Sequence, residues 1–269
     1  MKIDKSDYYP YTPGSGCDPD EELPHEKMEE SGIKDEIAEA PVKEETESRV
    51  EEHGKGKKPK PTFLDLACNA LSWILVPMLV SVWGTIMIFN LSTLCNVPYS
   101  TKLIFTLIVL AFNAAIPLVL VAILKIMGLV QDIGLNGRKE RYIPYIIMIA
   151  SYVGTALFFH AKHAPEWTCL FFYGAAVAAA VNMIVNFRWK ISAHAASMAG
   201  LVAMLLIINR VDIPSVRLDW WIAATILLSG MLGSARIWLG RHTLGQVLAG
   251  YASGFLSVYL ISFLYPSIV

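Results

Sequence analysis

Acidic side chains are nearly missing from most of this sequence of 269 residues. Of its 23 Asp and Glu residues, 17 lie before Phe63, and the rest of the chain holds only six. Asp132 has no second aspartate close to it in the sequence. Polyprenyl transferases hold magnesium diphosphate with clustered aspartate pairs, so the lack of such pairs disfavours that class of enzyme.

Cysteine is scarce too, and signals for secretion or transport are missing. The four cysteines are too scattered for a disulfide framework or a zinc site, and His160 and His163 are too few to hold a metal. The N-terminal region lacks the apolar segment of a secretory signal peptide. No spans in corresponding halves of the chain read as half-helices broken by Gly or Pro, which disfavours a small-solute transporter.

Long apolar runs dominate the sequence from residue 63 onward. Each is roughly 20 residues long, the length that a helix needs to cross a hydrocarbon layer of about 30 Å. We therefore expect an all-α, polytopic membrane helix bundle over residues 63–269. Its transmembrane helices should number about seven, at 63–90, 103–129, 143–161, 167–186, 191–209, 219–237 and 243–264.

Residues 1–62 have a different composition. They are rich in Glu, Lys, Pro and Gly and have few large apolar side chains. Such a segment buries too little surface to offset the entropy of ordering, so we predict a disordered charged tail.

Basic residues are unevenly divided between the two sides that the crossings define. Near the membrane ends, twelve Lys and Arg lie on the side of the tail and four on the other. The positive-inside rule places the tail, and the loops on its side, in the cytoplasm. We expect an integral protein of a bacterial inner membrane.

One loop on the tail's side ends in Ser192, Ala193 and His194, just after two basic residues. A serine caps a helix start well, and the N–H groups behind it attract phosphate with help from the helix dipole. The structural alternative is a capping serine next to a buried, hydrogen-bonded histidine.

The stretch SARIWLGRHTLGQ, residues 234–246, places cations between two apolar runs, where an unpaired cation is expensive. Arg236 would end one span, Gly240 permits the turn, and His242 would begin the next span. Gln246 lies four residues further, and its amide oxygen can accept the Nδ1–H of His242, which leaves Nε2 unprotonated as a nucleophile. Alternatively, Arg236 and Arg241 are interfacial cations that reach toward lipid headgroups, with the histidine as a helix cap.

A third loop, GLNGRKERYIP, carries Arg138 and Arg141 one turn apart ahead of Pro144. Guanidinium groups bind phosphate oxygens bidentately, although basic loops are also ordinary on the cytoplasmic side. Even numbers of crossings separate the three loops, so they should meet on one membrane face. Together they predict a cationic phosphate site.

These segments resemble the motifs of the type 2 phosphatidic acid phosphatase superfamily, which also contains vanadium haloperoxidases and bacterial acid phosphatases. The third motif of that family is Ser-Arg, five residues, His, three residues, Asp. The chain reproduces this spacing at Arg236, His242 and Gln246, with Ala235 in place of the serine.

The other two motifs are matched less closely. The second motif, Pro-Ser-Gly-His, aligns with Ile191-Ser192-Ala193-His194. The first, Lys, six residues, Arg-Pro, is matched poorly, because Pro144 follows Arg141 by three residues and Gly134 stands where lysine is expected. The resemblance covers roughly residues 100–265.

The resemblance implies roles for these residues. His242 would be the nucleophile that forms a phosphohistidine, and His194 the general acid that protonates the leaving oxygen. The phosphoryl oxygens would be held by Arg236, Arg141, Ser192 and the N–H of Ala193, with Arg138 in place of the missing lysine. No metal or other cofactor is expected, because arginines supply the positive charge. Gln246 in place of aspartate stabilises imidazolium less, which predicts a weaker catalyst.

A phosphate site at the membrane boundary suits an amphiphile whose headgroup enters the basic pocket while its tails stay in the hydrocarbon. The prediction is an integral membrane phosphatase acting on a lipid phosphomonoester or diphosphate, such as phosphatidate, phosphatidylglycerol phosphate or a polyprenyl phosphate. The alternative is a noncatalytic, phosphatase-like membrane protein that binds anionic lipid or a protein partner. Neither function involves nucleic acid, and the sequence leaves the substrate and the oligomeric state open.

Overall fold

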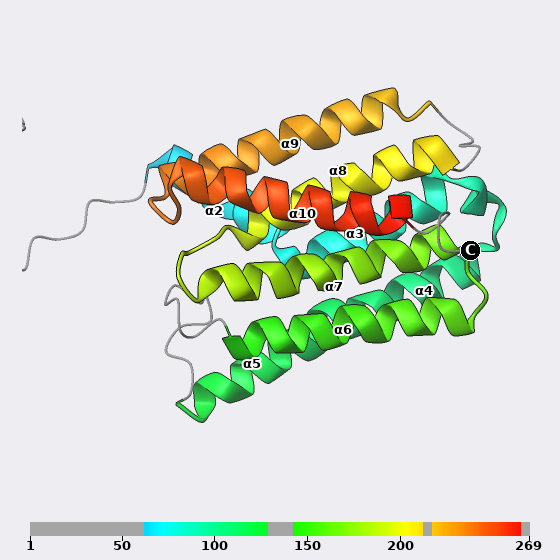
Figure 1. Ribbon diagram of the computed structural model, residues 1–269, viewed down its shortest axis with the longest axis horizontal. Coiled ribbons are helices and arrows are strands. Elements are labelled where there is room, and N and C mark those ends of the chain that lie inside the picture. Colours follow the sequence, from blue (N-terminus) through cyan, green and yellow to red (C-terminus); the bar gives the residue numbers. More distant parts are fainter. Residues whose placement is uncertain (1–61, 129–141, 212–216, 265–269) are drawn as a thin grey trace, which may run out of the picture. The chain divides into compact units, whose positions relative to one another are not determined.

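Helices that run side by side make up the described part of the chain (Figure 1). The structure, a computed structural model, describes residues 62–128, 142–211 and 217–264, and there is no strand within these ranges. The predicted all-α fold is therefore confirmed. The predicted tail up to residue 61 and the loop with Arg138 and Arg141 lie outside the described residues.

Six helical segments in the described ranges are long and apolar enough to cross a membrane. The first, Tyr99–Ile126, comprises α4 (Tyr99–Leu110), the π-helical segment η2 (Ala111–Ala115) and α5 (Ile116–Ile126). The others are α6 (Tyr142–Ala161), α7 (Glu166–Asn186), α8 (Ala193–Val211), α9 (Asp219–Trp238) and α10 (Leu244–Leu264). They correspond to the last six of the seven predicted spans.

The first predicted span, residues 63–90, is not one continuous helix. It consists of α2 (Phe63–Ile74) and α3 (Pro77–Leu91), which are bent by 62° relative to each other. Pro77 causes the break, because proline lacks an N–H and forces the preceding residue out of the helical region. Val76 accordingly has an extended backbone, and Pro77 is the first residue of α3.

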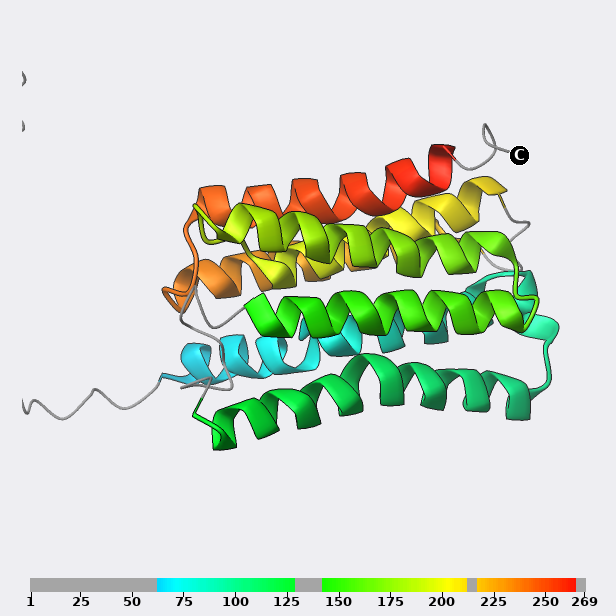
Figure 2. The same ribbon diagram turned by 60° about the horizontal axis from the view of Figure 1, so that its bottom comes forward.

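The bent pair nevertheless runs from one end of the bundle to the other. Figures 1 and 2 show α2 near the turn between α9 and α10, whereas α3 leads toward the end where α4 begins. At the α2 end, the indole Nε1–H of Trp238, the last residue of α9, donates to Asp65 Oδ1 at 3.0 Å. Counted as one broken span, the pair brings the number of candidate crossings to seven.

Helix α8 is the most deeply buried of the candidate spans and contacts α3, α7, α9 and α10. Its closest neighbour is α10, and two glycines four residues apart make this close approach possible. A Cβ atom at Gly250 would stand 2.5 Å from the carbonyl oxygen of Ser192, and one at Gly254 would overlap the carbonyl oxygen of Ala196. This GxxxG spacing lets membrane helices approach backbone to backbone, and here it holds the N-terminal end of α8 against the first half of α10.

Candidate functional site

A cavity of about 600 Å³ lies at the end of the bundle where α8 and α10 begin. Its size falls within the range of sites that hold small ligands, about 300–1,000 Å³. Residues from α2, α3 and each of the helices α5 to α10 line it, together with the turn between α9 and α10. Four of the predicted site residues meet around this cavity: Ala193, His194, Arg236 and His242.

The turn between α9 and α10 fixes the distance between Arg236 and His242. Gly240 has a φ of 64°, in the left-handed region that glycine adopts without strain. The N–H of Gly240 donates to Ile237 O, and the N–H of Arg241 to Arg236 O, which is the Schellman pattern at a helix C-terminus. The N–H of His242 also donates to Arg236 O, at 3.3 Å, so Arg236 and His242 are tied together through the backbone.

Helix α10 begins two residues later than expected, at Leu244, and His242 belongs to the turn. The reason is Thr243, which exchanges hydrogen bonds with Gln246: the Thr243 N–H donates to Gln246 Oε1 at 3.4 Å, and the Gln246 N–H to Thr243 Oγ1 at 3.5 Å. This exchange is the capping box of a helix start. Gln246 therefore has a structural role in addition to its contact with the histidine.

The imidazole of His242 is buried, and its Nδ1 lies 3.1 Å from Gln246 Oε1. The same Gln246 atom accepts the backbone N–H of Thr243, so it has to be the amide oxygen, and Nδ1 of His242 has to be the donor. In the neutral ring the lone pair is then on Nε2. This is the tautomer that the sequence predicts for a nucleophilic histidine.

His194 lies in the first turn of α8, and its Nε2 is 3.2 Å from the carbonyl oxygen of Ser72. Ser72 is close to the C-terminus of α2, where the last carbonyls have no partner within the helix. The break before Pro77 thus supplies an acceptor for His194.

Ser192 is fully buried and caps α8 rather than lining the cavity. Its Oγ accepts the N–H of Ala195 at 3.4 Å, and its own N–H donates to Gln246 O at 3.2 Å. The second of these bonds joins the start of α8 to the first turn of α10. Ser192 thus holds together the two helix ends that carry His194 and Gln246.

Several cavity-lining residues were missed by the sequence analysis. Lys125, near the end of α5, and Arg241 line the cavity and add positive charge to it. Asn182 of α7 is buried in the cavity wall, where its Oδ1 accepts from Ser253 Oγ at 2.6 Å. A lone amide within an apolar span is a signal that would have identified it.

Residues 185–267 match the family model described as the PAP2 superfamily. The matched stretch includes the second and third motifs, with His194, Arg236, His242 and Gln246, and confirms the predicted resemblance over these residues. Neither the curated proteins nor the solved structures include a match to the chain. The family match indicates phosphatase activity on phosphate esters, and the long apolar helices fit a lipid environment.

Proposed function

We propose that this protein is an integral membrane phosphatase that hydrolyses a phosphomonoester or diphosphate of a lipid through a phosphohistidine. The observation that carries the proposal is the orientation of His242, whose Nδ1 is bonded to Gln246 Oε1 within a cavity shared with His194 and Arg236. A nucleophile with an orienting partner, a second histidine and an arginine are the groups that metal-free phosphoryl transfer needs.

In the first step, Nε2 of His242 attacks phosphorus and the bond from phosphorus to the ester oxygen breaks. His194 gives its proton to the leaving alkoxide. Arg236 neutralises charge on the phosphoryl oxygens, a task in which Arg241 and Lys125 can assist from the cavity lining. In the second step, water attacks phosphorus, the bond from phosphorus to Nε2 of His242 breaks, His194 takes a proton from that water, and inorganic phosphate leaves.

The setting of the cavity supports the proposal of a lipid substrate. The cavity combines charged residues from the helix ends with apolar residues from helices that are long enough to span a membrane. The phosphate of an amphiphile fits the charged region, and its hydrocarbon fits the apolar region. Of the two functions that the sequence leaves open, catalysis is the one that this pairing of histidines favours.

The test is phosphate release from a panel of lipid phosphates by the purified, full-length protein and by His242→Ala. We expect wild type to release phosphate and His242→Ala to fall to background, because this variant lacks the proposed nucleophile. His160→Ala is the matched control, since His160 is an exposed histidine at the end of α6 and does not line the cavity.

Equal background rates for all three proteins would refute catalysis. That result would favour the noncatalytic alternative, in which the same cationic cavity binds an anionic lipid headgroup. Binding of phosphatidate-containing vesicles by wild type, lost in Arg236→Ala, would then support that alternative.

A further inference from the structure

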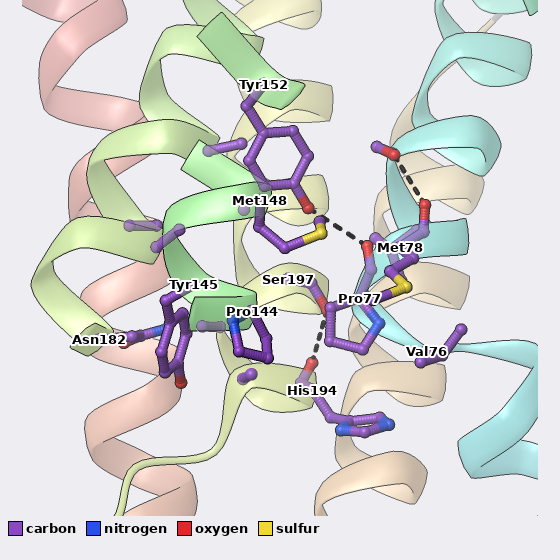
Figure 3. Close-up of a pocket in the computed structure, with 18 of the residues that line it drawn as sticks. Val76, Pro77, Met78, Pro144, Tyr145, Met148, Tyr152, Asn182, His194 and Ser197 are labelled. Carbon is purple, nitrogen blue, oxygen red and sulfur yellow. Dashed lines mark hydrogen bonds between the residues drawn. The ribbon is translucent and has the colours of Figure 1, made fainter. Parts of the chain in front are cut away.

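The inner part of the cavity has no task in the chemistry proposed above, and its walls are apolar. Six of the side chains that form it come from four helices: Met78 of α3, Met148 and Tyr152 of α6, Phe171 and Ala178 of α7, and Val258 of α10. We refer to this space as the apolar chamber. Figure 3 shows Met78 and Met148 approaching from opposite walls, with His194 at one end of the view and Tyr152 at the other.

The chamber reaches deep into the bundle. Asn182 and Phe171 both line the cavity from α7, and Asn182 is the one nearer to the helix end that leads to Ser192. Eleven residues separate them, which corresponds to about 16 Å along a helix that rises 1.5 Å per residue. This is roughly half of a hydrocarbon layer of about 30 Å.

Hydroxyl groups along the chamber are engaged with their own helices. Ser81 Oγ donates to Met78 O at 2.9 Å, and Ser197 Oγ donates to His194 O at 3.0 Å. A serine bonded in this way offers little polar surface to a ligand. The lining therefore suits hydrocarbon rather than a second polar group.

Buried side chains close the inner end. Tyr152 extends from α6 to α3, where its hydroxyl donates to Pro77 O at 3.4 Å (Figure 3). Phe171 and Val258 are 4% and 1% exposed, and Phe171 lies against Gly84, where a Cβ would stand 3.1 Å from its ring. A chain that enters the chamber therefore meets a fixed end.

At the side, the cavity is open toward the surroundings of the bundle. Trp73 of α2 and Leu118 of α5 line the cavity, yet they are 67% and 49% exposed. The 62° bend directs α2 away from the line of α3 at this level. A ligand can pass between α2 and α5 without leaving the apolar layer.

We propose that the apolar chamber takes the hydrocarbon chain of the substrate into the bundle, and that the protein selects lipid phosphates with a single chain whose length the chamber limits. This rests on the proposed function and departs from the expectation that the tails of the substrate stay in the bilayer. The cavity of about 600 Å³ has to hold the phosphate as well as the hydrocarbon, so a two-chain phosphate fits less well.

The experiment measures binding of alkylphosphonates, whose P–C bond cannot be hydrolysed, at concentrations below micelle formation. The full-length protein in lipid nanodiscs is titrated with methyl-, butyl-, hexyl-, octyl- and decylphosphonate. Affinity should rise by up to about fourfold for each methylene that leaves water, and then level off once the chamber is full. A dialkylglycerol phosphonate of the same chain length should bind more weakly than the single-chain probe.

Two variants change the chamber in opposite directions. The affinity of Ala178→Leu should level off at a shorter chain, and the affinity of Met148→Ala at a longer one. Methylphosphonate should bind both variants as tightly as it binds wild type. Val177→Phe is the matched control, since it adds volume to α7 at a neighbouring position that is 40% exposed. If Ala178→Leu does not fold, Met148→Ala still decides the question.

The chamber would be refuted by a chain-length profile that is the same in wild type, Met148→Ala and Ala178→Leu. Equal affinity for the two-chain phosphonate would refute the single-chain selectivity. Because binding is measured without turnover, chain-length dependence in a protein that releases no phosphate would refute the proposed function and keep the chamber. Phosphate release without chain-length dependence of binding would refute the chamber and support the proposed function.

Discussion

At the scale of single residues, one oxygen atom determines how His242 is held. Oε1 of Gln246 accepts a hydrogen bond from His242 Nδ1 and another from the Thr243 N–H. An amide can do both, but it carries no charge with which to stabilise the imidazolium that forms during phosphoryl transfer. Gln246 therefore fixes the ring and leaves its charge largely uncompensated.

This arrangement predicts that Gln246→Glu raises kcat by roughly tenfold. Glutamate has the same length, so it keeps both hydrogen bonds and adds a negative charge, and a bond to a charged group is stronger by about 1 kcal/mol or more. Gln246→Leu should lower kcat by a similar factor or more, since the ring loses its partner. The measurement is phosphate release under saturating substrate. A slower Gln246→Glu enzyme would show that His242 does not become positively charged during the reaction.

His194 gives a second prediction at this scale. As the general acid, it matters most when the leaving oxygen is a poor leaving group. His194→Ala should therefore lower kcat on an alkyl phosphate by about 10²–10⁴-fold and on p-nitrophenyl phosphate by much less. The ratio of the two rates is measured for wild type, His194→Ala and the control His160→Ala. An equal loss on both substrates would assign His194 a structural role instead.

At the scale of elements, the contact between α8 and α10 positions the site. Gly250 and Gly254 allow the two helices to touch, and the bond from the Ser192 N–H to Gln246 O joins their N-terminal ends. The bent pair α2–α3 adds the carbonyl of Ser72 beside His194. Three elements that are distant in the sequence thus hold the two histidines.

Gly254→Ala tests the contact between α8 and α10. The new methyl group would overlap the carbonyl oxygen of Ala196, so the helices have to separate, at a cost of about 1–3 kcal/mol. We expect a lower midpoint of thermal unfolding and a loss of phosphate release. Gly230→Ala on α9 is the control, because a Cβ there meets nothing within 4 Å. Unchanged stability in Gly254→Ala would mean that the helices are not in backbone contact.

At the scale of the whole molecule, the number of apolar runs in the sequence predicts that the tail and the basic loops around the site lie on one side of the membrane. The charge distribution predicts that this side is cytoplasmic. The native cysteines allow a test, because Cys17 belongs to the tail and Cys95 to the 3₁₀ segment η1 (Thr93–Asn96), which follows the first crossing.

In variants that retain only one cysteine each, an impermeant maleimide should label Cys95 in intact cells. Cys17 should be labelled only after permeabilisation. The reverse pattern would place the cavity on the outer side, and labelling of both cysteines in intact cells would show that the bent pair α2–α3 does not cross.

Much of the fold and part of the site could be predicted, because the signals are local in the sequence. The length of each apolar run predicts a crossing, and the spacing of Arg236, His242 and Gln246 predicts the hydrogen bond that the structure contains. The break at residues 75–76 was missed, although Pro77 is a strong local signal, because apolar character continues through it. The capping role of Thr243 was missed too, because His242 precedes it in the same polar turn and was expected to begin the helix.

The sequence by itself determined that the chain is a membrane helix bundle and that His194 and His242 lie at helix ends on one face. It could do so because hydrophobic length and motif spacing depend only on neighbouring residues. Only the tertiary structure decided that Lys125, Asn182 and the Ser72 carbonyl join these histidines, and that an apolar chamber lies behind them. Those features depend on how closely helices approach and bend, which is set by packing between residues that are far apart along the chain.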